Sequence, residues 1–153
     1  MSKSSNTLRR SMLMSAIVAG AIGLAFAAHA VTPRSSADVA ADLNRAGYAE
    51  VREIEYDDGL WEAEVRRADG RWGEVHVDPV SGEVFDAQAG RALLDAAALA
   101  AALQSQGYTA IEDLDREGAT WSAEAVGPDG QRVELRLSGY DGRVLHSEAE
   151  WDD

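Results

Sequence analysis

The chain has 153 residues, which is enough for one or two small domains. It contains no cysteine, so disulfide bonds and a lipid anchor on cysteine are both excluded. It carries 27 acidic against 14 basic residues, and a surface with this excess repels nucleic acid and anionic lipid but suits solubility, cations or a basic protein partner.

Residues 1–30 predict a secretory signal peptide. Three basic residues precede an uncharged run over 11–28, and small residues around His29 form an A-x-A cleavage signal that ends at Ala30. Cleavage near Ala30 would leave a periplasmic or secreted protein with a net charge of −16. An uncleaved membrane anchor is the alternative, because the run is nearly long enough to span a bilayer. The paired arginines suggest the twin-arginine route, but the general route is preferred.

Two short helices are predicted, 60 residues apart. The first begins at Ser35, whose side chain is suited to cap a helix, with Asp38 completing a capping box. It ends at Gly47, since glycine adopts the left-handed conformation after a helix at little cost. The second begins at Asp95 and ends at Gly107 in the same way. Apolar residues recur at helical spacing within both segments.

Alternating apolar and polar residues, bounded by glycine turns, predict strands after each helix. The strands expected after the first helix cover 51–56, 60–67, 72–77 and 83–85. Those expected after the second cover 111–115, 120–126, 132–137 and 143–145.

The second half of the chain repeats the first half without a gap. Residues that recur as the same type 60 positions later include Leu43, Gly47, Tyr48, Trp61, Ala63, Glu64, Asp69, Gly70 and Gly82. We therefore expect an α+β protein of two tandem modules, each one helix packed on a small antiparallel sheet of three to four strands. The repeated Trp61 and its counterpart Trp121 are expected in the two cores.

The predicted boundaries place module 1 at 35–86, a linker at 87–94, module 2 at 95–147 and an acidic tail at 148–153. A module of about 50 residues would be marginally stable alone, so the two gain by packing together. The short linker favours a compact pair over separate modules.

Charge suggests a register for the hairpin around Asp69. A three-residue loop at 69–71 would oppose Arg66 to Glu74 and Glu64 to His76, and the second module would oppose Glu124 to Arg136. A shift by two would place glutamates opposite each other in both modules, which is destabilising. The first register is therefore predicted.

Four segments, taken in this order and spacing, resemble the PepSY domain. They are Ala46-Gly47-Tyr48, Trp61-Glu62-Ala63-Glu64-Val65, Asp69-Gly70-Arg71 and Asp78-Pro79-Val80-Ser81-Gly82-Glu83-Val84. In the second copy, 138–144 replaces the Asp-Pro segment. The resemblance implies a non-catalytic exported domain of the kind found in propeptides that hold secreted metallopeptidases inactive. At fold level the tandem arrangement is also similar to beta-lactamase inhibitory proteins, and no catalytic residue is carried over.

Enzymatic chemistry has little support in the sequence. There is no cysteine nucleophile, P-loop, dinucleotide fingerprint or H-E-x-x-H motif. After signal cleavage only His76 and His146 remain, at non-equivalent positions of the repeat and on strands expected to face the surface. We therefore expect no enzyme and no cofactor. Calcium is the one metal considered, because Asp57, Asp58 and Asp78 offer hard oxygen ligands, although their spacing does not fit an EF-hand.

Trp72 is the candidate binding residue. It aligns with Arg132 in the second copy, so the fold does not require an aromatic side chain there. We expect it on the sheet surface near Arg66 and Arg67, since an exposed aromatic beside arginines is typical of a binding hot spot. Partial burial at the module junction is the alternative. Trp151 is expected either to pack back or to fray with the tail.

The leading hypothesis is an exported, non-catalytic PepSY-type protein-binding module. Its expected partner is an exported protein, either a secreted or periplasmic peptidase that it inhibits or modulates, or another envelope protein. The alternative is an acidic periplasmic protein that binds a small ligand or Ca²⁺. Neither hypothesis involves nucleic acid, or a membrane after signal cleavage.

Overall fold

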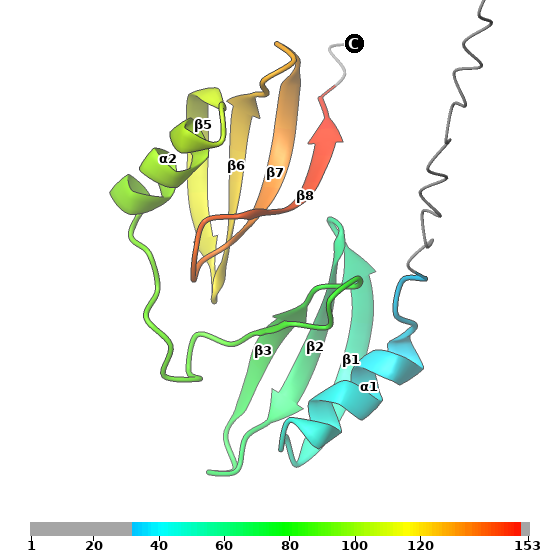
Figure 1. Cartoon of the computed structure of the whole chain (residues 1–153). Helices are drawn as coiled ribbons and strands as arrows, with labels where there is room; N and C mark the ends of the chain where they lie inside the picture. Colours follow the sequence, from blue (N-terminus) through cyan, green and yellow to red (C-terminus); the bar gives the residue numbers. More distant parts are fainter. Residues whose placement is uncertain (1–31, 151–153) are drawn as a thin grey trace, which may run out of the picture. The chain divides into compact units, whose positions relative to one another are not determined.

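The computed structural model describes residues 32–150, which form two helices and two antiparallel four-stranded sheets (Figure 1). The predicted α+β class is therefore correct. The predicted signal peptide 1–30, its cleavage point at Ala30 and Trp151 lie outside the described residues. Among the helices of residues 32–150, none combines the length and apolar character needed to cross a membrane.

Each half of the described chain has one helix followed by four strands. The first half contains α1 (Ser36–Arg45), β1 (Glu50–Asp57), β2 (Leu60–Arg66), β3 (Trp72–Val77) and β4 (Val84–Phe85). The second contains α2 (Ala96–Ser105), β5 (Thr109–Glu117), β6 (Thr120–Val126), β7 (Arg132–Ser138) and β8 (Val144–Ala149). In each sheet every strand pairs with the next one along the chain. The last strand, β8, runs two residues into the segment expected to be a tail.

The helix ends match the prediction. The Ser35 hydroxyl accepts a hydrogen bond from the Asp38 amide, and the Asp38 carboxylate accepts one from the Ser35 amide at 2.9 Å, which completes the capping box. Asp95 caps α2 by accepting from the Ala98 amide at 2.8 Å. Gly47 follows the end of α1 with φ +100°.

Two clusters of buried side chains form the cores. The first joins residues of α1, β2 and β3, namely Val39, Leu43, Ala63, Val65, Val75 and Val77. The second joins residues of α2, β6 and β7, namely Leu99, Leu103, Trp121, Ala123, Ala125, Leu135 and Leu137. Trp121 is buried as expected. Trp61 is partly buried against the first cluster, and its indole N–H donates to the Arg34 carbonyl at 3.0 Å.

The register between β2 and β3 differs from the prediction, which was wrong. Glu64 lies opposite Glu74, and Glu124 lies opposite Glu134 in the second sheet. The loop consists of residues 68–70 and is closed by a hydrogen bond from the Arg67 amide to the Arg71 carbonyl at 2.9 Å.

Backbone geometry explains why this register is preferred over the one favoured by charge. A three-residue hairpin loop ends on a residue in the left-handed conformation, and Gly70 takes that place with φ +83°. The predicted loop would have put Arg71 there, which is costly for a residue with a Cβ. Arginines then offset the facing carboxylates, since Arg52 pairs with Glu64 at 2.7 Å.

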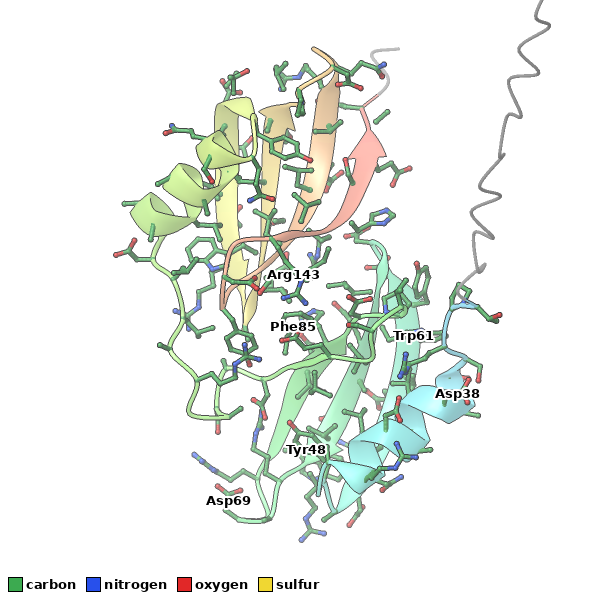
Figure 2. All side chains as sticks on the ribbon, viewed as in Figure 1. Asp38, Tyr48, Trp61, Asp69, Phe85 and Arg143 are labelled. Carbon is green, nitrogen blue, oxygen red and sulfur yellow. The ribbon has the colours of Figure 1, made fainter. Side chains whose placement is uncertain are left out.

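Several contacts join the two halves. The Tyr140 hydroxyl donates to the Asp86 carbonyl at 2.9 Å and accepts from the Asp86 amide at 3.0 Å. The Tyr140 ring stacks on Phe85 with centroids 5.6 Å apart. Arg143 pairs with Glu83, which lies 60 residues earlier, so the two occupy the same position of the repeat. Phe85 and Arg143 are labelled in Figure 2.

Candidate functional site

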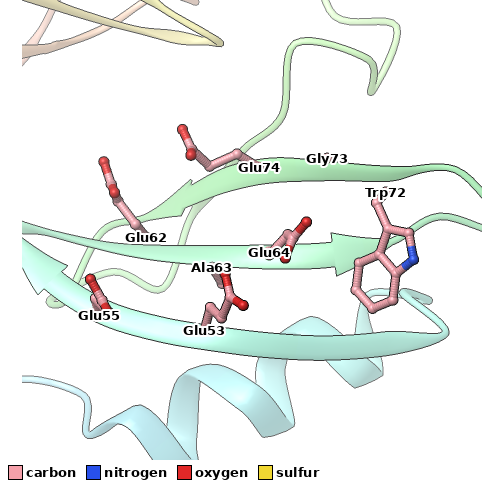
Figure 3. A pocket seen from close by; sticks show the side chains of 8 residues that line it. All are labelled: Glu53, Glu55, Glu62, Ala63, Glu64, Trp72, Gly73 and Glu74. Atoms are coloured by element: carbon pink, nitrogen blue, oxygen red, sulfur yellow. The ribbon is translucent and has the colours of Figure 1, made fainter.

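A groove of about 440 Å³ runs over the outer face of the first sheet (Figure 3). It is lined by Glu53, Glu55, Glu62, Ala63, Glu64, Trp72, Gly73 and Glu74, which come from β1, β2 and β3. Five carboxylates and one large aromatic ring therefore share a single concave surface. Such a surface can attract cationic groups and offers one apolar platform for them.

Strand alternation places these carboxylates on the outer face. Ala63 and Val65 of β2 belong to the buried cluster, so Glu62 and Glu64, which alternate with them, project from the opposite face. A bulge in β1 between Arg52 and Glu55 gives Glu53 a positive φ of +53°. The equivalent residue Asp113 has φ +46°, so the bulge is a feature of both halves and not of the groove alone.

Trp72 forms one end of the groove and is 36% exposed. The Arg52 guanidinium lies 3.9 Å from the centroid of its ring and pairs with Glu64 at 2.7 Å. This hydrogen bond from Arg52 is the main cause that lowers the pKa of Glu64. The aromatic platform thus already carries one cation, supplied by the chain itself.

Among the described residues, the edge of the first sheet lacks a paired strand beside Trp72. Within residues 32–150, β4 pairs only with His76 and Val77 of β3, so no strand pairs with the Trp72–Val75 stretch on that side. In the second sheet, β8 follows β7 as far as Val133. The two halves therefore differ in strand pairing at this edge, and the Arg71 side chain beside it contacts Gln88 of the segment after β4 at 3.2 Å.

The structure brings together two of the three residues predicted to bind a partner. Arg66 lies opposite Trp72 in the strand register, and its side chain pairs with Glu50 at 2.7 Å. Arg67 is only 12% exposed and pairs with the buried Asp86 at 2.7 Å, so it is engaged inside the fold. The cation beside the Trp72 ring is Arg52, which the sequence reasoning missed.

The three aspartates considered for calcium do not converge in the structure. Asp57 is the last residue of β1 and Asp58 lies in the turn that follows, whereas the Asp78 carboxylate accepts hydrogen bonds from the Val80 and Ser81 amides in another turn. Within residues 32–150, the side chains that lie close enough together to hold one ion are Glu62, His76 and Glu117. None of the three aspartates belongs to this group. The calcium site therefore stays a prediction.

The expectation that both histidines face the surface is wrong for His76, which is 2% exposed. Its ring lies between Glu62, at 3.0 Å, and Arg136 of the second half, at 3.4 Å. His146 is partly buried, with ring atoms close to Gly59. Residues of the second half, such as Arg136, cover His76, which an isolated first sheet would expose. Strand alternation shows which face of the sheet His76 lies on, but not that the second half packs against that face.

The groove residues could have been found from the sequence with the correct hairpin register. Gly70 signals the loop that sets Glu64 opposite Glu74, and this pairing gathers the outward carboxylates of β2 and β3. The position of Arg52 depends on the bulge in β1, which carries no clear sequence signal.

Comparison with known proteins adds one match. A search of curated proteins found no similar sequence. Residues 11–88, which are 78 of the 153 residues, match the PepSY_2 family, described as the peptidase propeptide and YPEB domain. The matched region contains α1, all four strands of the first sheet and the whole groove. Since the match covers half of the sequence, the chain belongs to the PepSY_2 family of peptidase propeptide and YPEB domains.

Proposed function

We propose that this chain is an exported, non-catalytic binding protein whose first sheet holds a basic, extended segment of another exported protein. A secreted or periplasmic peptidase is the favoured partner, and binding would inhibit or modulate it. The basic start and apolar run within residues 1–30 support export, and the family description supports a link to peptidases.

The observation that carries the proposal is the groove with Trp72 at its end. Five glutamates line it, while an exposed aromatic ring supplies the kind of anchor that dominates binding energy at interfaces. A lysine or arginine side chain of the partner would replace Arg52 over the Trp72 ring and gain both a cation–π contact and nearby carboxylates.

The unpaired edge of β3 suggests how a partner segment would lie. An extended peptide can add a strand there, with main-chain hydrogen bonds supplying affinity and side chains reaching the groove. A charged rim mainly raises the rate of association and makes it sensitive to salt. Binding should therefore weaken as ionic strength rises.

We also propose that 95–147 is a second PepSY-like copy, with 35–86 as the first and 87–94 as the linker. The repeat of residue types at a constant separation and the repeated order of one helix and four strands support this. The second copy has Arg132 where the first has Trp72, and its strand β7 is paired with β8 as far as Val133. The first copy is thus the proposed binding half.

The test begins with the purified protein immobilised and exposed to the exported proteins of its own organism, with a charge-matched acidic protein as the control. An enriched partner is identified by mass spectrometry, purified, and measured for affinity and for peptidase activity. Trp72→Ala should weaken binding by about 30-fold, as expected for a hot-spot aromatic.

Tyr56→Ala is the matched control, because Tyr56 is 55% exposed but does not line the groove. It should leave affinity unchanged. Equal affinity of the Trp72→Ala variant and the unmodified protein would contradict the proposed anchor, and failure to enrich any protein over the acidic control would contradict a stable partner.

A further inference from the structure

A cluster of buried and half-buried ionisable side chains lies where the two halves meet. Glu62 of β2 and His76 of β3 face each other across the first sheet, and Glu117 reaches them from the end of β5. One ligand atom from each of these three side chains lies within 4.8 Å of the others. One nitrogen and two oxygens thus converge from both halves of the chain.

Arg136 lies against this cluster but is poorly satisfied there. One of its terminal nitrogens pairs with Glu117, and the other lies 3.4 Å from His76 Nε2, which is long for a hydrogen bond. Its Nε is buried and has no hydrogen-bond partner, although the side chain is only 6% exposed. An unpaired buried polar atom of this kind is costly.

The same His76 nitrogen has two conflicting neighbours. The Glu62 carboxylate lies 3.0 Å from Nε2 and requires a proton on it, whereas the Arg136 N–H requires a lone pair on it. One nitrogen cannot meet both demands. A metal ion would resolve the conflict, because it accepts the neutral imidazole lone pair and both carboxylates at once.

We propose that Glu62, His76 and Glu117 form a binding site for a divalent transition-metal ion, with Zn²⁺ as the probe. A mixed imidazole and carboxylate set suits zinc, whereas calcium prefers oxygen ligands alone. Zinc ligands lie about 2.0–2.2 Å from the ion, so small side-chain rotations would close the site from its present spacing. The bound ion would tie the two halves together.

Arg136 acts as the internal competitor for this ion. It can turn away from Glu117 toward other carboxylates, because Asp58, Glu134 and Glu148 line a small cavity beside it. The carboxylates near Arg136 outnumber its single positive charge, so their electrostatic field also favours binding of a metal cation. The site shares Glu62 with the proposed partner groove, but His76, Glu117 and Arg136 do not line the groove, so variants at these three positions test the metal site separately.

The test is a titration of the purified protein with ZnCl₂. Calorimetry measures the affinity and the number of ions bound, and NMR monitors the histidine rings. We expect one ion per chain, shifts in the His76 ring signals, and a rise in Tm of about 5–10 °C at a hundredfold excess over Kd. His76→Gln and Glu117→Gln should abolish the binding. Arg136→Gln should tighten it by about tenfold or more, because a competing cation is removed.

His146→Gln is the matched control for histidine loss, and Asp57→Asn with Asp78→Asn controls for loss of acidic charge. Both should bind zinc as tightly as the unmodified protein. Because Glu117 is partly exposed, Glu117→Gln should keep its fold, which circular dichroism would verify. Absence of binding in both the unmodified protein and Arg136→Gln, or undiminished binding in Glu117→Gln, would overturn the proposal.

Discussion

At the scale of single residues, Asp86 gathers the buried polar contacts of the first half. It is 4% exposed and accepts hydrogen bonds from Arg67 at 2.7 Å, from the Tyr48 hydroxyl at 2.9 Å and from the Gln88 amide at 2.9 Å. Burial alone would raise the pKa of Asp86, but these donors outweigh it and hold the pKa below its ordinary value of 3.8. Burial and the hydrogen bond to Asp86 in turn raise the pKa of Tyr48.

The lowered pKa of Asp86 predicts how stability depends on pH. A carboxyl with a lower pKa in the folded state stabilises fully above its unfolded value, and this stabilisation is lost as pH falls through its folded pKa. Asp86→Asn should cost about 3–5 kcal/mol at pH 7, because Arg67 is left buried without its counter-ion. Urea unfolding should show this cost shrinking below pH 3.8.

The control for this prediction is Asp69→Asn. Asp69 also has a lowered pKa, caused by hydrogen bonds from the Arg71 amide and side chain, but it lies on the surface. A loss of stability as large as that of Asp86→Asn would contradict the role given to the buried pair.

A second prediction at this scale compares two glycines with positive φ. Gly59 and Gly70 have φ values of +79° and +83°, so alanine should cost about 1–2 kcal/mol of conformational energy at either position. At Gly59 a Cβ would also collide with the His146 ring, whereas at Gly70 the nearest atom is 3.9 Å away. Gly59→Ala should therefore be the more destabilising in urea unfolding, and equal costs would argue against the contact with His146.

At the scale of elements, short local signals set where helices and turns begin and end. The capping box at Ser35, the cap at Asp95 and the glycines after each helix were all predicted and confirmed. These caps and glycines act on backbone groups only a few residues away, so the local sequence is sufficient to predict where each helix begins and ends. The register of the β2–β3 hairpin was also local, but it follows from Gly70 and not from the cross-strand charges used to predict it.

Ser35→Ala tests the first of these signals. The Ser35 hydroxyl accepts from the Asp38 amide, so the variant should lose about 0.5–2 kcal/mol in the free energy of unfolding. Ser36→Ala, one residue inside the helix, is the control and should change stability little, since alanine is a good helix former. A similar effect of both variants in urea unfolding would mean that the cap is unimportant.

At the scale of the whole molecule, the two halves meet through equivalent positions of the repeat. His76 contacts Arg136 and Glu83 pairs with Arg143, and each pair is separated by 60 residues. If positions 83 and 143 carried the same residue, two arginines or two glutamates would face each other and repel. The divergence between the halves at positions 83 and 143 thus creates opposite charges where they touch.

A double-mutant cycle of Glu83→Gln and Arg143→Gln measures one of these contacts. Both side chains are partly exposed, so the coupling free energy should be about 0.5–1 kcal/mol and should fall with added salt. The pair of Arg71 and Asp69 on the hairpin is the control for a surface ion pair within one half. Zero coupling between Glu83 and Arg143 would contradict an ionic contribution to this junction.

The sequence by itself determined the α+β class, the two helices with their caps and the approximate strands, because these depend on residues that are close in the chain. Only the tertiary structure decided that His76 is buried, that Arg67 binds Asp86 and that Arg52 covers Trp72. Each of these depends on a side chain that reaches its position from another strand or from the other half of the chain. Alternation along a strand identifies a face, but it cannot indicate what packs against that face.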